Sequence, residues 1–555
     1  MTSTAAIYFH PDIIERPETP LVGRRAAGTS FLRGYIQHVQ ADVLHCVTDT
    51  QSAIEEFAGV CAQNNWHGDV VGHLQDDPEA LANPGTLFVP GPSLATFAWS
   101  RRSRANRYSL CGITHTLSTK TIQTDLANLL YAPVEPFDAI ICTSTAARHV
   151  VEHHLDAAEE YIRARFDARN VPRPLLPTIP LGVETSRFAP NPETRRSMRQ
   201  RLNLSDEQIV LMTMGRLSVF EKMSPGPMFL ALERAARSIR QRLVLLMVGW
   251  FKDETAEKQH KTMAAVMAPS VDVLFADGND ETLRTDIWAA ADIFTLPVDN
   301  IQETFGLAPV EAMAAGLPVV CSDWNGFKDT VAHGETGFRV PTMAPSPENG
   351  TELAKRHGSG KDQYSQYLMA INQKTCIDLG AYADAIVKLA TDASLRKNMG
   401  NAGRKRAIEL FDWSVVVPQY QSLWAEQTEI RLRITPNEKD ANPRNALSEL
   451  DPFQTYAHYP TTTISPTTEI HAPIQVKNEE VHRLLILSGA HAYGSLIASS
   501  ARLTSLQNVV HQHGALTLSA LSDQCSAPIS EIQGLVLWLA KYGLVTVNFG
   551  TVKTT

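Results

Sequence analysis

The chain has 555 residues, of which 44% are hydrophobic and 20% are charged, and its formal net charge is -9. These values are ordinary for a globular protein of about two to four domains, and the negative charge creates no overall field that would attract nucleic acid. The start of the chain lacks the pattern of a signal peptide, and no apolar run approaches the roughly 20 residues that span a bilayer, so we expect a cytoplasmic protein.

Seven cysteines are spread along the chain without a CxxC pair. An odd number at wide spacing favours reduced thiols over a disulfide framework or a zinc site. Because no cluster of His, Asp and Cys has metal-ligand spacing either, we expect neither a metal nor a cofactor.

The first 410 residues alternate short apolar runs with helical patterns. The runs contain mostly consecutive Val, Ile and Leu, which is typical of strands covered on both faces in parallel sheets. This alternation predicts doubly wound α/β domains. The expected strands are 5–10, 42–48, 110–116, 138–144, 209–215, 243–249, 271–277, 292–298, 318–323 and 337–341.

Two such α/β units are expected, a Rossmann-like domain over residues 1–185 and a second one over 186–409. The hinge between them is placed in the segment TIPLGVETSRFAP (178–190), and the polar stretch 343–375 is expected to be an insertion. A helix over 410–433 completes this part of the chain.

The composition changes after residue 433. The stretch 434–478 is rich in Pro and Thr and has little periodicity, so we expect a linker. Three helical patterns and a final strand follow within 479–555, and their order resembles a winged-helix domain. The expected helices are 503–514, 518–525 and 529–543, and the expected strand is 544–548.

Winged helices often bind DNA, which requires clustered Lys and Arg. Residues 501–555 contain only three Lys and Arg residues, and the segment ISEIQGLVLWLAK (529–541) in the recognition-helix position is nearly all apolar. We therefore expect this domain to contact protein, including further copies of the chain, and do not expect DNA binding.

Two cations, Arg216 and Lys222, follow the strand expected at 209–215. Together they can neutralise a diphosphate and the charge of a leaving group. A single Arg or Lys is usually a solvated surface residue. The phosphate-binding interpretation of this pair is supported by a second segment, which independently indicates a phosphate site.

That segment is ETFGLAPVEAMAAGLPVV (303–320), which carries two glutamates eight positions apart. It follows an expected strand, and ligands of open α/β sheets bind at the carboxyl ends of strands. Gly306 allows a close backbone approach, and a helix starting near Leu307 offers free N–H groups to phosphate. Glu303 and Glu311 can accept hydrogen bonds from hydroxyl groups. The pattern indicates a nucleotide sugar, with a capped helix carrying two solvated acids as the alternative.

Three motifs together resemble the family 4 retaining glycosyltransferases, which have the GT-B fold. They are ETFGLAPVE, GRLSVFEK and IPLGVETSRF, and 378–426 resembles the usual end of the catalytic unit. The resemblance covers roughly residues 1–427 and implies two Rossmann-like domains with a cleft between them, the helix over 410–433 crossing back onto the first. One departure is that Met223, Ser224 and Pro225 stand where the family often has Gly soon after the Lys.

The resemblance also implies roles for individual residues. Arg216 and Lys222 would hold the donor diphosphate, and Glu311 the ribose. Glu303 would hold the sugar and phosphate together with the backbone amides of three residues, Phe305, Gly306 and Leu307. Retention in this family is usually assigned to a front-face route in which the leaving diphosphate helps to deprotonate the acceptor hydroxyl.

The N-terminal half provides three more candidates. Gly28, in LVGRRAAGTSFLRGY (21–35), is expected near a helix start, either in a loop that closes over donor phosphate and acceptor or in an ordinary turn. His115 ends an expected strand; by resemblance it contacts the transferred sugar, and otherwise it is structural. The four arginines of SRRSRANR (100–107) would suit an anionic acceptor or an acidic membrane surface, or form a solvated charged stretch.

We therefore expect a hexosyltransferase that uses a UDP- or GDP-sugar and an acceptor hydroxyl on a glycan, a lipid-linked compound or a small molecule. Peripheral contact with the inner face of the membrane is compatible with this. One alternative is a regulator that binds a nucleotide sugar and uses its C-terminal domain as output. Another is a GT-B sugar phosphorylase or synthase.

Overall fold

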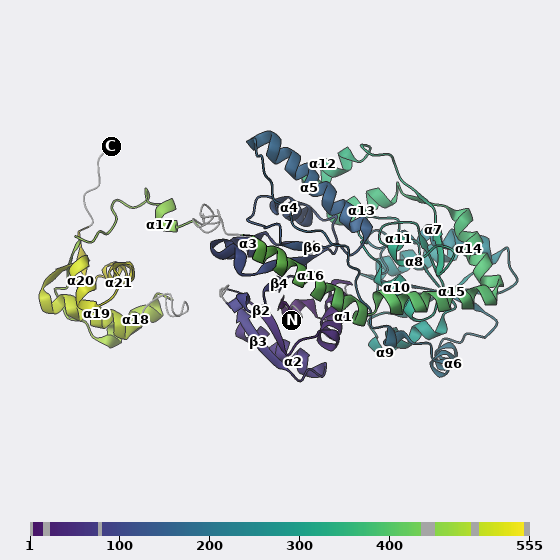
Figure 1. The fold of residues 1–555 in the computed structure, drawn as a ribbon, viewed down its shortest axis with the longest axis horizontal. Coiled ribbons are helices and arrows are strands. Elements are labelled where there is room, and N and C mark those ends of the chain that lie inside the picture. Colours follow the sequence, from purple (N-terminus) through teal and green to yellow (C-terminus); the bar gives the residue numbers. More distant parts are fainter. Residues whose placement is uncertain (1–3, 15–22, 76–79, 435–449, 490–498, 549–555) are drawn as a thin grey trace. The chain divides into compact units, whose positions relative to one another are not determined.

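The computed structural model describes residues 4–14, 23–75, 80–434, 450–489 and 499–548 (Figure 1). The chain divides into two compact units, Met1–Arg444 and Asn445–Thr555, and each is described by itself. Within the described ranges, no helix is both long and apolar enough to cross a membrane. All seven cysteines lie in these ranges as unpaired thiols.

The N-terminal part of the first unit is a doubly wound α/β domain. Its strands are parallel and lie in the order β3-β2-β1-β4-β5-β6, which is the Rossmann order. The strands are β1 (Ala6–Tyr8), β2 (Val43–Thr48), β3 (Asp69–Leu74), β4 (Thr86–Phe88), β5 (Ser109–Ile113) and β6 (Ala139–Ile141). The helices are α1 (Gly23–His38), α2 (Gln51–Gln63), α3 (Ala95–Arg101), α4 (Lys120–Asn128) and α5 (Thr145–Phe166).

The second part of this unit repeats the architecture. Its parallel strands lie in the order β12-β11-β10-β7-β8-β9, which is the same order counted from its own first strand, β7. The strands are β7 (Ile209–Met214), β8 (Leu243–Gly249), β9 (Asp272–Asp277), β10 (Ile293–Leu296), β11 (Val319–Ser322) and β12 (Gly337–Val340). The helices are α6 (Pro192–Arg201), α7 (Pro225–Ala236), α8 (Glu254–Met267), α9 (Glu281–Asp286), α10 (Leu307–Ala314), α11 (Phe327–Thr330), α14 (Leu379–Thr391) and α15 (Ala393–Arg406).

The prediction of two Rossmann-like α/β domains is confirmed, and each of the ten expected strands coincides with an observed one. The sequence missed β3 and β4. β3 is an edge strand whose residues are only partly buried, and β4 is three residues long, so neither forms a long apolar run.

The long helix α16 (Trp413–Arg433) lies against the N-terminal domain (Figure 1). Its apolar face joins the core formed by β1 and α1, and Trp413 is buried with its Nε1 donating to Ser30 Oγ at 2.9 Å. The indole ring packs against Gly34 of α1 and Gly182, where a Cβ on either glycine would overlap it. The helix therefore fastens the end of the second domain onto the first.

The polar stretch expected as an insertion contains two helices, α12 (Thr351–Gly358) and α13 (Tyr364–Asn372). An antiparallel pair of short strands, β13 (Thr342–Met343) and β14 (Cys376–Ile377), closes its base.

The second unit is built around a small antiparallel sheet of order β16-β15-β17. Its elements are α17 (Pro452–Thr455), β15 (Glu469–His471), α18 (Asn478–Leu487), α19 (Ser500–His513), β16 (Ala515–Thr517), α20 (Leu518–Cys525), α21 (Ile529–Lys541) and β17 (Thr546–Val547). The apolar side chains of α21 form much of the core of this unit, which accounts for the apolar character of that helix.

The expected linker over 434–478 differs from the structure at its end. β15 lies inside this range and is the central strand of the sheet, so the folded unit begins earlier than the expected boundary at 479. A three-residue strand has no visible periodicity, and its partners are distant in sequence, which explains why composition placed it in a linker. Residues 435–449 of the expected linker lie outside the described residues.

The packing of Trp413 can be tested with two alanine substitutions. In Gly34→Ala the new methyl group overlaps the buried indole ring, so we expect a lower melting temperature, equivalent to about 1–3 kcal/mol of overpacking. Gly59 of α2 is the matched control because nothing lies near its Cβ position. Since alanine is the better helix former, Gly59→Ala should hold or raise the melting temperature. Equal melting temperatures for the two variants would contradict the assigned packing.

Candidate active site

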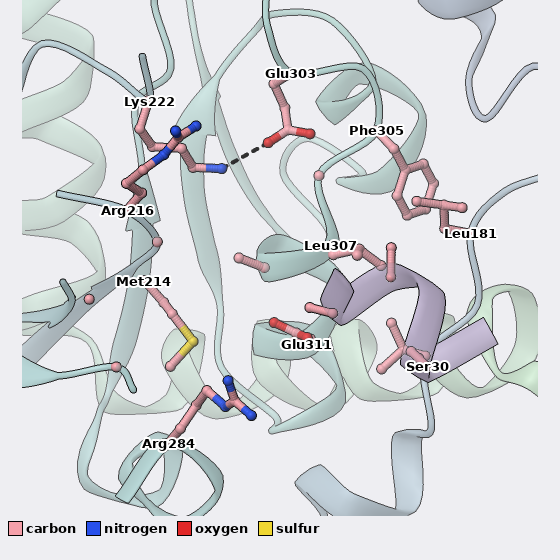
Figure 2. A pocket seen from close by; sticks show the side chains of 18 of the residues that line it. Ser30, Leu181, Met214, Arg216, Lys222, Arg284, Glu303, Phe305, Leu307 and Glu311 are labelled. Carbon is pink, nitrogen blue, oxygen red and sulfur yellow. Dashed lines mark hydrogen bonds and ion pairs between the residues drawn. The ribbon is translucent and has the colours of Figure 1, made fainter. Parts of the chain in front are cut away.

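A cavity of about 500 Å³ lies between the two Rossmann-like domains, at the carboxyl ends of strands from both sheets. It is lined by all but one of the residues that the sequence selected. These are His115, Arg216, Lys222, Glu303, Phe305, Gly306, Leu307 and Glu311. Figure 2 labels six of them, Arg216, Lys222, Glu303, Phe305, Leu307 and Glu311. The structure therefore brings the predicted phosphate-binding, sugar-binding and ribose-binding residues to one place.

Lys222 and Glu303 form an ion pair at one end of this cavity, with 2.8 Å between Nζ and Oε2 (Figure 2). Burial by itself raises the pKa of Glu303. The positive charge of Lys222 and its hydrogen bond, together with backbone hydrogen bonds from Phe305 and Thr304, outweigh burial and hold the pKa below its usual value. Glu303 is therefore an ionised acceptor for hydroxyl groups at neutral pH.

Arg216 lies beside this pair and is held by the carboxylate of Glu221, with 2.6 Å between Nη1 and Oε2. The side-chain amide of Gln302, in the orientation that satisfies both its neighbours, accepts a hydrogen bond from Arg216 Nη2 at 3.2 Å. Arg216 is thus held by Glu221 and Gln302, and Lys222 by Glu303. A diphosphate bound beside these residues would contact two cations.

Two residues that the sequence did not select, Asp299 and Asn300, fix the loop that carries Lys222. Asp299 accepts a hydrogen bond from the backbone N–H of Ser224 at 3.0 Å. Asn300 is fully buried, and its Nδ2 donates to the carbonyl oxygens of Phe220 and Lys222 at 3.3 and 3.0 Å. The dipeptide follows β10, so it ties the Lys222 loop to the loop that carries Glu303. From the sequence alone, Asp299 and Asn300 predict only a turn. Their hydrogen-bond partners lie about 80 residues upstream, where no local pattern reveals them.

The segment after Glu303 has the predicted local structure. Gly306 has φ +99°, and a Cβ there would overlap the ring of Phe327, so both conformation and space require glycine. Leu307 begins α10 as expected, and N–H groups in the first turn of a helix have no carbonyl partner within it. The Phe305 amide instead hydrogen-bonds to Glu303, while its buried ring packs against Phe411 at 5.9 Å.

The prediction for Gly28 does not match its position. Gly28 lies inside α1, not in a loop near its start, and does not line the cavity. Its missing side chain allows α1 to approach the backbone carbonyl of Ile13. The neighbouring residues of α1, among them Thr29, Ser30 and Arg33, face the cavity instead. The glycine therefore serves helix packing, which spacing in the sequence cannot distinguish from phosphate binding.

The arginine-rich stretch 100–107 is also not a uniform charged surface. Arg101 is buried and forms a bidentate pair with Asp138, with both hydrogen bonds at 2.6 Å. Arg102 Nη1 donates to the carbonyl oxygen of Trp99 at 2.6 Å. Arg101 is thus unavailable to an anionic acceptor or a membrane surface.

Three hydrogen bonds join the two domains beside the cavity. Ser144, at the N-terminus of α5, donates to the carbonyl oxygen of Thr304 at 2.6 Å, and the next residue, Thr145, donates its backbone N–H to Asp329 at 2.5 Å. Tyr364 of the insertion shares a 2.7 Å hydrogen bond with Ser118, three residues after His115. These contacts tie the Ser118 segment to the insertion and the Glu303 loop to the start of α5.

The insertion also supports the cation loop directly. Asn372 Nδ2, at the end of α13, donates to the carbonyl oxygen of Val219 at 3.1 Å. Val219 stands between Arg216 and Lys222 in the sequence, so the loop is held from the insertion as well as from Asp299 and Asn300.

The anchoring role of Asp299 predicts a particular pH dependence. Burial raises the pKa of Asp299 to about 7. The folded state therefore binds a proton more tightly than the unfolded state, and stability is lost as pH rises from about 4 to about 7. Asp299→Asn keeps an acceptor for Ser224 but cannot ionise, so its melting temperature should fall less than that of the wild type across this range. Parallel melting curves from pH 4.5 to 8 would contradict the assignment.

Comparison with known proteins gives the site a family context. Residues 194–351 match the family described as "Glycosyl transferases group 1". The lipopolysaccharide 1,2-N-acetylglucosaminetransferase of Salmonella typhimurium is 29% identical over 33% of this chain and 47% of its own length. The GDP-mannose-dependent alpha-(1-6)-phosphatidylinositol monomannoside mannosyltransferase of Mycolicibacterium smegmatis is 27% identical over 46% of this chain and 57% of its own. The chain thus spans about half the length of these curated relatives.

Among solved structures, the UDP complex of Anabaena HepE aligns with 71% of this chain and 95% of its own, at 16% identity and a TM-score of 0.47. Sucrose-phosphate synthase from Thermosynechococcus elongatus aligns with 77% and 99%, at 18% identity and a TM-score of 0.46. The family match covers Arg216, Lys222, Glu303 and Glu311. The part of the chain that is similar to this family therefore contains all four residues.

Proposed function

We propose that the protein is a retaining glycosyltransferase that moves a hexose from a nucleoside diphosphate sugar to an acceptor hydroxyl. The observation that carries this proposal is the gathering of two cations, a helix N-terminus and two carboxylates around one cavity between two Rossmann-like domains. Each group matches one part of such a donor, and the match to group 1 glycosyltransferases includes all of them.

The donor would lie along the cavity. Arg216 and Lys222 suit the diphosphate, which would replace Glu221 as the partner of Arg216. The first turn of α10 adds backbone N–H groups and the positive end of the helix dipole. Glu311, further along the cavity in Figure 2, suits the two ribose hydroxyls, and Glu303 suits hydroxyls of the sugar.

The chemistry follows from this arrangement. As the bond between the anomeric carbon and the diphosphate breaks, negative charge grows on the leaving oxygen, and Lys222 and Arg216 stabilise it. The acceptor hydroxyl attacks from the same face, and its proton passes to the leaving diphosphate, so no protein base is needed. Glu303 orients both the sugar and Lys222, because its carboxylate can contact the first while it pairs with the second. His115 lines the same cavity and would contact the transferred sugar.

The relatives indicate the kind of acceptor. Their names specify lipopolysaccharide, phosphatidylinositol monomannoside and D-inositol 3-phosphate. These acceptors share a glycan or polyol that presents hydroxyl groups, and we infer an acceptor of this class here. A lipid-linked one would place the enzyme at the inner face of the membrane.

The function is tested by the cation variants. Purified protein is incubated with UDP-glucose, UDP-N-acetylglucosamine, GDP-mannose and GDP-glucose, and release of the nucleoside diphosphate is measured. Because each cation stabilises leaving-group charge, Arg216→Ala and Lys222→Ala should lower turnover by about 100-fold or more. Lys261→Ala is the control, since Lys261 pairs with Glu257 on an exposed face of α8 and does not line the cavity.

The outcomes separate the alternatives. If the wild type binds a nucleotide sugar but releases no nucleoside diphosphate from any of the four donors, the regulator is favoured. If release requires inorganic phosphate, a phosphorylase is favoured. The anomeric configuration of the first product, read by NMR, tests retention. Normal turnover in both cation variants would overturn the assigned roles.

We further infer that the C-terminal unit is a winged-helix-like module that contacts protein. The order α19, β16, α20, α21 and β17 supports this inference, with β15 completing the sheet. Of the few cations there, Arg502 is paired with Glu531 at 3.1 Å, which gives little support to DNA binding. Protein contact therefore suits this module better.

Removing this unit should leave the chemistry intact. A chain of residues 1–434 keeps α16 and every residue that lines the cavity, so we expect donor turnover within about twofold of the full chain. Light scattering of both proteins reports whether the removed unit joins copies of the chain. A well-folded 1–434 protein that no longer binds donor would show that the unit belongs to the active site.

A further inference from the structure

One end of the cavity contains an arginine that the donor roles above do not use. Arg284 of α9 lines the cavity, and Figure 2 shows it at the end opposite to Arg216, Lys222 and Glu303. Glu311 lies between the two ends in this view. If the diphosphate lies at the first end and the ribose at Glu311, as the proposed function requires, the end beside Arg284 receives the base.

The wall at this end is shaped for a flat ring. Gly249 ends β8, Gly278 follows the adjacent strand β9, which leads into α9 and Arg284, and both glycines line the cavity. Their backbones are tied together, because Gly278 N donates to Gly249 O at 3.0 Å. A Cβ on Gly249 would overlap the carbonyl of Gly215. The result is a stretch of sheet edge without side chains, over which a planar group can lie.

The remaining lining at this end is largely apolar. Met214 lies beside Arg284 in Figure 2 and contributes apolar surface, and Thr285, the next residue after Arg284, adds one hydroxyl group to the lining. Arg284 is only partly exposed and is the charged residue among these neighbours. A base placed here is therefore recognised chiefly by the hydrogen-bond acceptors that it can offer to a guanidinium.

The candidate bases differ in this respect. Guanine presents two adjacent acceptors, O6 and N7, which match the two parallel N–H groups of a guanidinium. Uracil presents carbonyl oxygens that are separated by an N–H donor, so it can take only a single such bond from the same direction. Adenine places an amino donor beside N7, which an arginine cannot accept.

We propose that Arg284 selects a guanine nucleotide, so that the donor is a GDP-sugar. This inference rests on the proposed function for the position of the diphosphate and ribose. It goes beyond that function because it names the base and the side chain that reads it.

The experiment measures the affinities of GDP and UDP by calorimetry for the wild type and for Arg284→Met, Arg284→Lys and Arg196→Met. The wild type should bind GDP at least about tenfold more tightly than UDP, in line with one bidentate contact. Arg284→Met should weaken GDP binding until the two affinities agree within about threefold, and leave UDP binding nearly unchanged. Arg284→Lys keeps the positive charge but lacks the two parallel N–H groups, so it should lose most of the preference for GDP over UDP. This variant provides the test if Arg284→Met does not fold. Arg196, exposed on α6 and outside the cavity lining, is the control and should keep the preference.

Two results would overturn the inference alone. One is wild-type protein that binds UDP as tightly as GDP. The other is an Arg284→Met variant that loses affinity for both nucleotides by the same factor, which would mean that Arg284 acts on the diphosphate or on folding. Wild-type protein that binds neither nucleotide nor any nucleotide sugar would overturn the proposed function together with the inference.

Discussion

The ion pair between Lys222 and Glu303 is the interaction on which the candidate site depends. An ion pair of this kind, partly open to solvent, adds little stability by itself. Its importance is geometric, because the two residues come from different loops at the carboxyl ends of neighbouring strands. Asp299 and Asn300 bind one loop to the other through backbone groups, so the cation and the carboxylate keep their separation without a ligand. The site is thereby organised before any ligand arrives, which reduces the conformational entropy that ligand binding must overcome.

The same logic extends to the relation between the two domains. A cavity between domains keeps its shape only if the domains keep their relative position. Here α16 packs into the core of the N-terminal domain, while Ser144 and Tyr364 join the domains beside the cavity. The contacts of Ser144 and Tyr364 are polar, whereas Trp413 and the apolar face of α16 are buried in apolar surroundings. The apolar contact can therefore act as the permanent joint, and the polar ones can break and re-form when a ligand binds in the cavity.

The sequence predicted the features that depend on residues close together in the chain and missed those that join residues far apart in it. The parallel strands, the helix start at Leu307 and the glycine at 306 depend on neighbours within a few residues, and the sequence predicted all three. The roles of Asp299 and Asn300, and the bond between Ser118 and Tyr364, join residues 75 to 246 positions apart, and no local pattern reveals them. Gly28 was wrongly predicted in the opposite way. Its local pattern suggested a ligand-binding loop, but the glycine is required because the backbone of Ile13 approaches it closely.

The two ends of the cavity are built in different ways, and this difference bears on how specificity arises. At the diphosphate end, cations and a helix start are fixed by hydrogen bonds between loops, so a substitution there disturbs both charge and geometry. At the other end, the proposed base would lie over the backbone of Gly249 and Gly278, and Arg284 of the short helix α9 would provide the selective contact. A side chain on such a permissive surface can change without altering the loops that hold the diphosphate. Under the proposed function, choice of base would therefore be separable from the transfer chemistry, and substitutions confined to that end of the cavity could change the donor.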